Sequence, residues 1–258
     1  MPALMRVLRL FSLLTLCGAL LFPLGQATAI RQPAVAILVD TLDDELNTDG
    51  DCSLREAIIA ANTDAPRDAC PAGSGADTID LPAGDYVFAL AGTDEDAAAT
   101  GDLDITHDLT LTGAGKASTI IDGHGLDRVF DVRTFAISVQ ISDVTITGGD
   151  SNGFIGGGIL LAHGNGLTLT NSRVKDNTGS AGIYVTGLST LTLVNTRVYN
   201  HDQKGIVIGS GSTATLINSL VSDNTTIFEG AGITNTPTAT ATLAFTPGHW
   251  VYLPIIQK

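Results

Sequence analysis

Apolar and polar residues alternate in short segments that recur along the middle of the chain. Three segments have the pattern most clearly: residues 167–174, 191–198 and 214–221. The asparagine inside each segment recurs after 24 and then 23 residues. Because successive side chains of a β-strand point to opposite faces, we expect the leucines and valines of each segment to face a core and the threonines to face solvent.

A Gly-Ile pair interleaves with these segments and recurs after 24, 23 and 27 residues, beginning at Gly158. A period of about 24 residues, with β-branched strands and with Gly and Asn at the corners, predicts one coil of a parallel β-solenoid better than a helical repeat. Residues 109–233 would then form about five coils. Asn171, Asn195 and Asn218 would lie in a column, one strand spacing apart.

Residues 30–108 have the signals of a cap, which an open solenoid end requires. Ser53-Leu-Arg-Glu56 is a capping box, and apolar residues follow it at helical spacing. We therefore expect an amphipathic helix from Ser53 to about Asn62 that lays its apolar face over the first coil. Residues 35–39 are expected to form a strand before this helix, and residues 78–90 the next strands.

The composition changes to Thr, Ala and Pro after position 233. Residues 234–247 are therefore predicted to be an extended linker without a core. The apolar tail that follows, residues 248–258, is far too short to span a membrane.

The N-terminus has the pattern of an export signal. Arg6 and Arg9 precede an uncharged apolar run, and small residues before Ile30 suit a signal peptidase. We therefore expect residues 1–29 to be a signal peptide and the mature chain to be secreted or displayed on the cell surface. The apolar run is shorter than the roughly 20 residues that span a bilayer, so we expect no transmembrane segment in the mature chain.

Charge and cysteine content narrow the partners of the mature chain. Removal of residues 1–29 leaves 11 basic and 27 acidic residues, a net charge of −16, which disfavours nucleic acid and anionic membranes as partners. Cys52 and Cys70 are the two cysteines that remain. An even count in an exported chain predicts one disulfide between them; the alternative is a pair of buried thiols.

The segment Cys52-Ser-Leu-Arg-Glu-Ala-Ile58, followed by Ala60-Ala61-Asn62, resembles the signature of the CSLREA-type domain. That resemblance implies an exported bacterial protein that continues as a right-handed parallel β-helix of the pectate-lyase-like superfamily. It implies no activity. The expected fold is thus all-β: a short right-handed parallel β-helix of about five coils with an N-terminal α-helical cap.

One segment before the helix has the spacing of a calcium-binding loop. Glu45, Asn47, Asp49, Asp51 and Glu56 stand at the first, third, fifth, seventh and twelfth positions of an EF-hand pattern, with a glycine at the sixth. No second loop of this kind follows. The alternative is that acidic residues before a helix favour its positive N-terminus and solvate an exposed loop. Calcium is the only cofactor for which the sequence offers a candidate.

The sequence offers no catalytic site. Asn62-Thr-Asp64 and Gly123-His-Gly125 echo fragments of the polygalacturonase pattern, but the paired aspartates and the Arg-x-Lys that those enzymes use do not occur in context. We expect a non-catalytic, adhesin-like module that binds a glycan or another surface through an outward face including Thr168, Thr170, Thr192 and Thr215. The alternatives are a polysaccharide lyase or glycoside hydrolase, and a structural envelope module. Two carboxylates aligned on adjacent coils, roughly 5 to 10 Å apart, would favour the enzyme.

Overall fold

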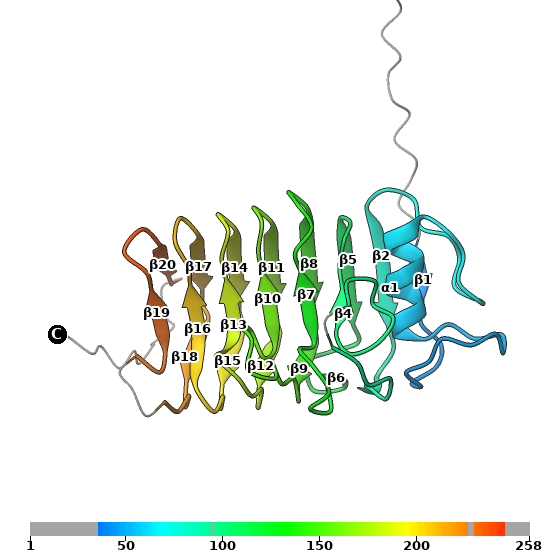
Figure 1. Cartoon of the computed structure of the whole chain (residues 1–258), viewed down its shortest axis with the longest axis horizontal. Helices are drawn as coiled ribbons and strands as arrows, with labels where there is room; N and C mark the ends of the chain where they lie inside the picture. The colour runs from blue at the N-terminus through cyan, green and yellow to red at the C-terminus, as the bar shows by residue number, and fades with distance from the viewer. Residues whose placement is uncertain (1–35, 94, 227–229, 246–258) are drawn as a thin grey trace, which may run out of the picture. The chain divides into compact units, whose positions relative to one another are not determined.

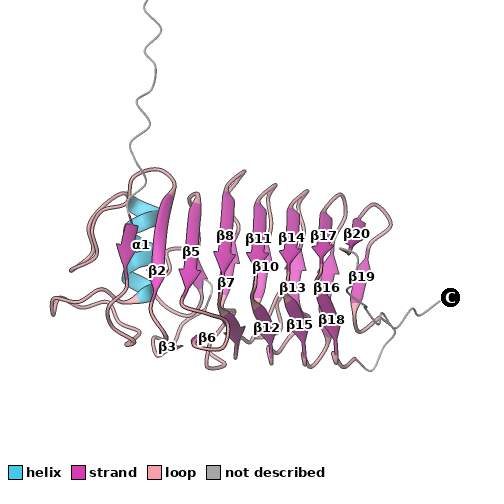
Figure 2. Ribbon diagram, turned by 180° about the vertical axis from the view of Figure 1, so that it is seen from behind, coloured by secondary structure: helices cyan, strands magenta, loops and turns pink. Residues whose placement is uncertain are grey.

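A computed structural model describes residues 36–93, 95–226 and 230–245. In them, three parallel sheets wind into a right-handed parallel β-helix (Figure 1). Each complete coil contributes one short strand to each sheet, and the strands pair in parallel with their counterparts one coil away (Figure 2). The predicted signal peptide and the predicted tail at 248–258 lie outside the described residues.

The strands of the three sheets follow the order of the coils. The first sheet contains β1 Ala36–Leu38, β2 Asp77–Leu81, β5 Leu109–Gly113, β8 Ser138–Ser142, β11 Gly166–Thr170, β14 Thr190–Val194, β17 Thr213–Ile217 and β20 Thr240–Ala244. The second sheet contains β3 Gly84–Val87, β6 Thr119–Asp122, β9 Thr145–Thr147, β12 Arg173–Lys175, β15 Arg197–Tyr199 and β18 Leu220–Ser222. The third sheet contains β4 Leu103–Asp104, β7 Phe130–Val132, β10 Ile159–Leu161, β13 Ala181–Val185, β16 Lys204–Ile208 and β19 Ile233–Asn235.

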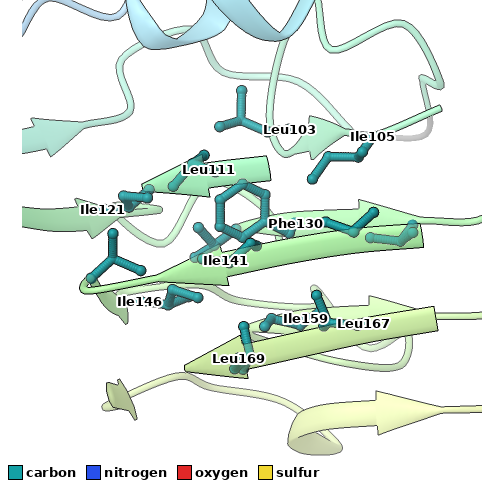
Figure 3. Packing of buried hydrophobic residues seen from close by; sticks show 14 of the residues in the cluster. Leu103, Ile105, Leu111, Ile121, Phe130, Ile141, Ile146, Ile159, Leu167 and Leu169 are labelled. Carbon is teal, nitrogen blue, oxygen red and sulfur yellow. The ribbon is translucent and has the colours of Figure 1, made fainter. Parts of the chain in front are cut away.

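The core is the column of apolar side chains between the three sheets. Leu111, Ile121 and Phe130, one from each sheet of a single coil, meet in this column above Ile141 of the next coil (Figure 3). The alternation read from the sequence is confirmed in β11, where Leu167 and Leu169 are buried and the threonine after each of them is partly exposed.

The corners between sheets explain the recurring asparagines. Asn171, Asn195 and Asn218 follow strands of the first sheet and have φ values of 49°, 50° and 49°. Asparagine adopts this left-handed conformation more readily than most residues with a side chain. The predicted column is present, and the side-chain amide of Asn171 donates to the Asp143 carboxylate one coil before it.

In three successive later coils, a polar residue follows a left-handed corner and accepts a backbone N–H from the preceding coil. At the corner between the second and third sheets, Asn177 accepts from Gly149 at 2.9 Å, His201 from Asn177 at 3.1 Å, and Asn224 from His201 at 3.1 Å. We call Asn177, His201 and Asn224 the polar ladder. These bonds pair backbone N–H groups that the turn of the chain would otherwise leave buried and unsatisfied.

The Gly-Ile motif makes room for this ladder. A Cβ added to Gly182 would lie 2.1 Å from Nε2 of His201, and one added to Gly158 would lie 2.8 Å from Nδ2 of Asn177. Each glycine therefore lets a ladder side chain of the following coil lie against the backbone, while the isoleucine after it enters the core.

The predicted cap helix is α1, Leu54–Thr63, at the β1 and β2 end of the stack (Figure 1). Ser53 is its N-cap, and both hydrogen bonds of the capping box with Glu56 are present. Arg55 is fully buried and holds the segment before β4: its guanidinium donates to the carbonyl oxygens of Ala98 and Gly101, both at 2.9 Å, and pairs with Asp44 at 2.5 Å.

The structure corrects the predicted linker at 234–247. Residues Thr240–Ala244 form β20 and pair in register with β17, and residues 233–235 form β19. The physical reason is visible in the sequence, since Thr-Ala-Thr-Leu at 240–243 repeats Thr-Ala-Thr-Leu at 213–216. The coils thus extend beyond position 233. None of the helices that the structure describes is long and apolar enough to cross a membrane.

Candidate functional site: an acidic pocket on the third sheet

Three buried aspartates gather where β4 pairs with β7. Asp104 and Asp131 are register partners on adjacent coils, and Asp102 directly precedes β4. One carboxylate oxygen from each of the three lies within 4.8 Å of the others. Asp104 is 4% exposed and Asp131 is 1% exposed. We call Asp102, Asp104 and Asp131 the aspartate triad.

Two arginines neutralise part of the charge of the triad. Arg128 donates to Asp102 at 2.9 Å and lies 3.0 Å from Asp131, so its guanidinium bridges these two carboxylates. Arg133 lies 2.8 Å from Asp131 and 2.7 Å from Asp96. Two of the three acids, Asp102 and Asp131, are therefore paired with guanidinium groups, and the triad is part of an ion-pair network.

Burial raises the pKa values of the triad. Desolvation is the main cause for Asp102, whose pKa rises to about 8 although Arg128 opposes the shift. The pKa of Asp104 rises to about 7, again mainly by desolvation, while a hydrogen bond from Ala98 N–H lowers it. Desolvation also raises the pKa of Asp131. Near neutral pH this cluster can therefore hold a proton.

Two members of the triad, Asp104 and Asp131, line a pocket of about 410 Å³, which we call the acidic pocket. Its lining residues are Asp96, Asp104, Ile105, Thr106, Asp131, Arg133, Thr134, Phe135 and His163. Phe135 is 76% exposed, and its ring stacks on that of His163 with the centroids 4.8 Å apart. Nδ1 of His163 lies 2.5 Å from the carbonyl oxygen of Arg133, which fixes the imidazole at the rim.

Sequence reasoning missed this pocket. Asp104 and Asp131 are 27 residues apart, which is one coil, but these early coils lack the Asn and Gly-Ile motifs that define the later register. The available signal was a charged residue inside two otherwise apolar strands of the third sheet. Asp104 and Asp131 are thus a carboxylate pair aligned on adjacent coils, with one oxygen of each within 4.8 Å of the other and with both residues almost completely buried.

The predicted calcium ligands lie near one another before α1. One oxygen from each of Glu45, Asp49 and Asp51 lies within 4.8 Å of the others. A second such group joins Asp51 to Glu56 and to Asp68, which the sequence pattern did not include. The structure places the predicted fifth member, Asn47, with its amide nitrogen toward Glu45 and Asp49, at 2.6 and 3.1 Å.

Cys52 and Cys70 are joined by the expected disulfide, with their Cα atoms 4.9 Å apart. This bond links the start of α1 to the loop that bears Asp68. It explains how a residue far outside the EF-hand spacing reaches the acidic group, and no sequence spacing could have given that proximity.

The predicted threonine face lies on the first sheet. Thr168, Thr192 and Thr215 are register partners in β11, β14 and β17. The same column includes Thr110 and Gln140 and ends at Thr242. Thr170 stands in a neighbouring column in which Val194 and Ile217 replace threonine. The threonines are partly exposed, in agreement with an outward orientation.

The polygalacturonase-like fragments have structural roles. Asn62 donates its amide to the carbonyl oxygen of Asp104 and accepts the N–H of Thr106, so it ties α1 to the coil below. His124 occupies a left-handed turn position with φ of 53° and is exposed. Neither residue lines the acidic pocket.

The coils each contain three short parallel strands that surround an apolar core, and a pocket lies on one outer face. This architecture is that of a parallel β-helix protein. Residues 116–245 match the family described as the right handed beta helix region. The match covers half of the chain, which belongs to this family. Searches of curated proteins and of solved structures find no match to the chain.

Proposed function

We propose that the mature chain is an exported, surface-associated β-helix module that binds carbohydrate in the acidic pocket. The observation on which this proposal depends is the combination of an exposed aromatic ring with charged side chains in one pocket. Phe135 offers an apolar platform, and Asp96 and Arg133 lie beside it in the same lining. Sugar rings present an apolar face and polar hydroxyl edges, and both find partners here.

Export and the CSLREA-type assignment are part of this proposal. They are supported by the N-terminal charge and apolar pattern, by the unbroken heptad at 52–58, and by a disulfide, which is typical of exported proteins. Intact mass measurement of secreted protein tests the leader: we expect the chain to begin at Ile30.

A glycan array tests the binding proposal with the mature chain. Phe135→Ala should lower binding at least tenfold, because the stacking platform is lost while the fold is unaffected. Phe154→Ala is the matched control, since Phe154 is also an exposed aromatic ring, at 55%, but does not line the pocket. Equal binding by both variants would contradict the pocket assignment.

The threonine face is the competing binding surface in the same experiment. Combined replacement of Thr168, Thr192 and Thr215 by Ala removes the hydroxyl groups of its central column. Loss of glycan binding in this triple variant, with normal binding by Phe135→Ala, would move the site to the first sheet. Our proposal expects the reverse.

A second candidate function, glycoside hydrolysis, is favoured by the register pairing of Asp104 with Asp131. Retaining glycosidases place two carboxyl groups roughly 5 Å apart, and here one oxygen of Asp104 lies within 4.8 Å of one oxygen of Asp131. A raised pKa suits Asp104 to the role of proton donor. Desolvation raises the pKa of Asp131 as well, and the neighbouring Arg128 and Arg133 oppose this shift. Release of reducing ends from a bound glycan, abolished in Asp104→Asn, would establish hydrolysis in place of simple binding.

A further inference from the structure

We propose that the loop before α1 is a calcium site that uses Asp51, Glu56 and Asp68 together with Glu45 and Asp49. These five residues are called the loop carboxylates below. The inference is independent of the carbohydrate-binding proposal, because none of them lines the acidic pocket.

The geometry brings the loop carboxylates into two overlapping groups. Glu45, Asp49 and Asp51 form one, and Asp51, Glu56 and Asp68 form the other, with one oxygen of each residue within 4.8 Å of the others in its group. Asp51 belongs to both groups. Calcium takes six to eight oxygen ligands at about 2.3–2.6 Å, and oxygens that surround one ion at that radius lie within about 5 Å of one another.

Glu56 is the strongest single indication of a ligand. Glu56 is fully buried, with 0% of its surface exposed. Oε2 accepts the N–H of Ser53 in the capping box at 3.2 Å, whereas Oε1 has no hydrogen-bond partner among the described residues. A buried carboxylate oxygen without a partner is destabilising, and a cation bound to the Asp51, Glu56 and Asp68 group would satisfy it.

Two further loop carboxylates also have a buried oxygen without a hydrogen-bond partner within the described ranges. Oε1 of Glu45 and Oδ1 of Asp51 are also buried atoms without a hydrogen-bond partner in the described part of the chain. Three of the five clustered carboxylates therefore have a buried oxygen atom without a hydrogen-bond partner among the described residues. Ordinary solvated acids before a helix would not bury these oxygens, so the solvating-loop alternative does not account for them.

The charge of the group lacks an internal counter-ion. In the aspartate triad, Arg128 bridges the acids, but no salt bridge involves a loop carboxylate within the ranges that the structure describes. The negative charge of the loop carboxylates therefore favours the binding of a cation.

The protein already holds these ligands in place. Oδ2 of Asp68 accepts the N–H groups of Asp49 and Gly50, at 3.1 and 2.8 Å, so Asp68 is fixed against the loop. The Cys52–Cys70 disulfide anchors the same segment to the start of α1. Such preorganisation reduces the entropy lost on binding. Asn47 differs from an EF-hand ligand, because its amide would have to turn over to offer its oxygen.

Calorimetry on the mature, disulfide-bonded chain tests the proposal after treatment with EDTA. Titration with Ca²⁺ should give one binding event per chain, and saturating Ca²⁺ should raise the melting temperature. Asp51→Asn should weaken binding at least tenfold, because Asp51 belongs to both groups. Asp68→Asn should also weaken it, and this effect would separate the present site from a plain EF-hand loop, which has no ligand at that position.

The controls keep folding and binding apart. Glu56→Gln preserves an oxygen that can accept the Ser53 N–H, so the helix cap remains while the charge is lost, and Ca²⁺ binding should fall. Asp85→Asn, at an exposed acid in β3, should bind Ca²⁺ as the wild type does. Absence of Ca²⁺ heat and of any melting shift at millimolar ion in the wild type would overturn the proposal. Undiminished binding in the folded Asp51→Asn and Glu56→Gln variants would overturn it as well.

Discussion

The polar ladder contains a histidine where its neighbours are asparagines, which makes folding stability sensitive to acid. His201 is 2% exposed, and its Nδ1 accepts the N–H of Asn177, so the ring is neutral with its proton on Nε2. Nε2 has no partner among the described residues. Burial is the main reason that the pKa of His201 falls from 6.5 to about 4.

The sign and size of the effect follow from this shift. Below pH 6.5 the unfolded chain binds a proton at His201, whereas the folded chain stays neutral until about pH 4. Stability is therefore complete above pH 6.5 and is lost as the pH falls through this window. At 1.36 kcal/mol for each unit of pKa, the loss reaches about 2 kcal/mol at pH 5 and about 3 kcal/mol at pH 4.

His201→Asn should remove this acid sensitivity. The asparagine would repeat the side chains of Asn177 and Asn224, which accept the equivalent backbone N–H groups in neighbouring coils. Urea unfolding followed by circular dichroism at pH 7.5 and at pH 5 gives the free energies. We expect the wild type to lose about 2 kcal/mol more than the variant between these two conditions.

The comparison with the variant is necessary because Asp102 and Asp104 act in the opposite direction. Their pKa values are raised in the folded chain, to about 8 and about 7, so their contribution to the free energy of unfolding falls as the pH rises from acid to neutral. Wild type and His201→Asn share these acids, so the difference between them isolates the histidine. His124→Asn, at an exposed left-handed turn, should retain the wild-type profile. An identical pH profile for wild type and His201→Asn would refute the ladder argument.

Three other predictions concern the architecture. Gly182→Ala should lower the free energy of unfolding by at least 2 kcal/mol, because its Cβ would lie 2.1 Å from the imidazole of the next coil; chemical denaturation measures this loss, and a change below about 0.5 kcal/mol would contradict it. Opening the disulfide by Cys52→Ser with Cys70→Ser should cost about 3 kcal/mol for its loop length, and an unchanged melting temperature would count against a structural role. Leu193→Ala, at a fully buried position, should cost about 2–5 kcal/mol, whereas Thr192→Ala on the outward face should stay within about 0.5 kcal/mol; similar losses for both would reverse the assignment of inside and outside.

The parts of the fold that could be predicted are those that repeat a local rule. Period-two alternation identifies the strands, and Asn at left-handed corners fixes their ends, so β11, β14 and β17 follow from the sequence. The capping box gives α1 for the same reason, since Ser53 and Glu56 act within one turn. Each of these features depends on residues that are close in the chain.

The parts that were missed depend on contacts between coils. β20 repeats the pattern of β17, but the Thr, Ala and Pro content around it favoured a linker, and only pairing with β17 identifies it as a strand. His201 joins the polar ladder because of its register with Asn177, not because of a recognisable motif. Asp68 reaches the loop carboxylates through a disulfide. Composition and spacing contain none of this information.

The heptad at 52–58 connects the two proposed sites, because Arg55 and Glu56, which are neighbours in α1, contact different parts of the chain. Ser53 and Glu56 cap the helix, and one carboxylate oxygen of Glu56 lies within 4.8 Å of oxygens of Asp51 and Asp68. Arg55 points to the other side and binds the carbonyl oxygens of Ala98 and Gly101, just before the strand that bears Asp104. The arginine thus positions one wall of the acidic pocket, while the glutamate belongs to the proposed calcium site. The contacts of the heptad are thus structural on one side of α1 and belong to a proposed ion site on the other, and none of them specifies a ligand for the acidic pocket.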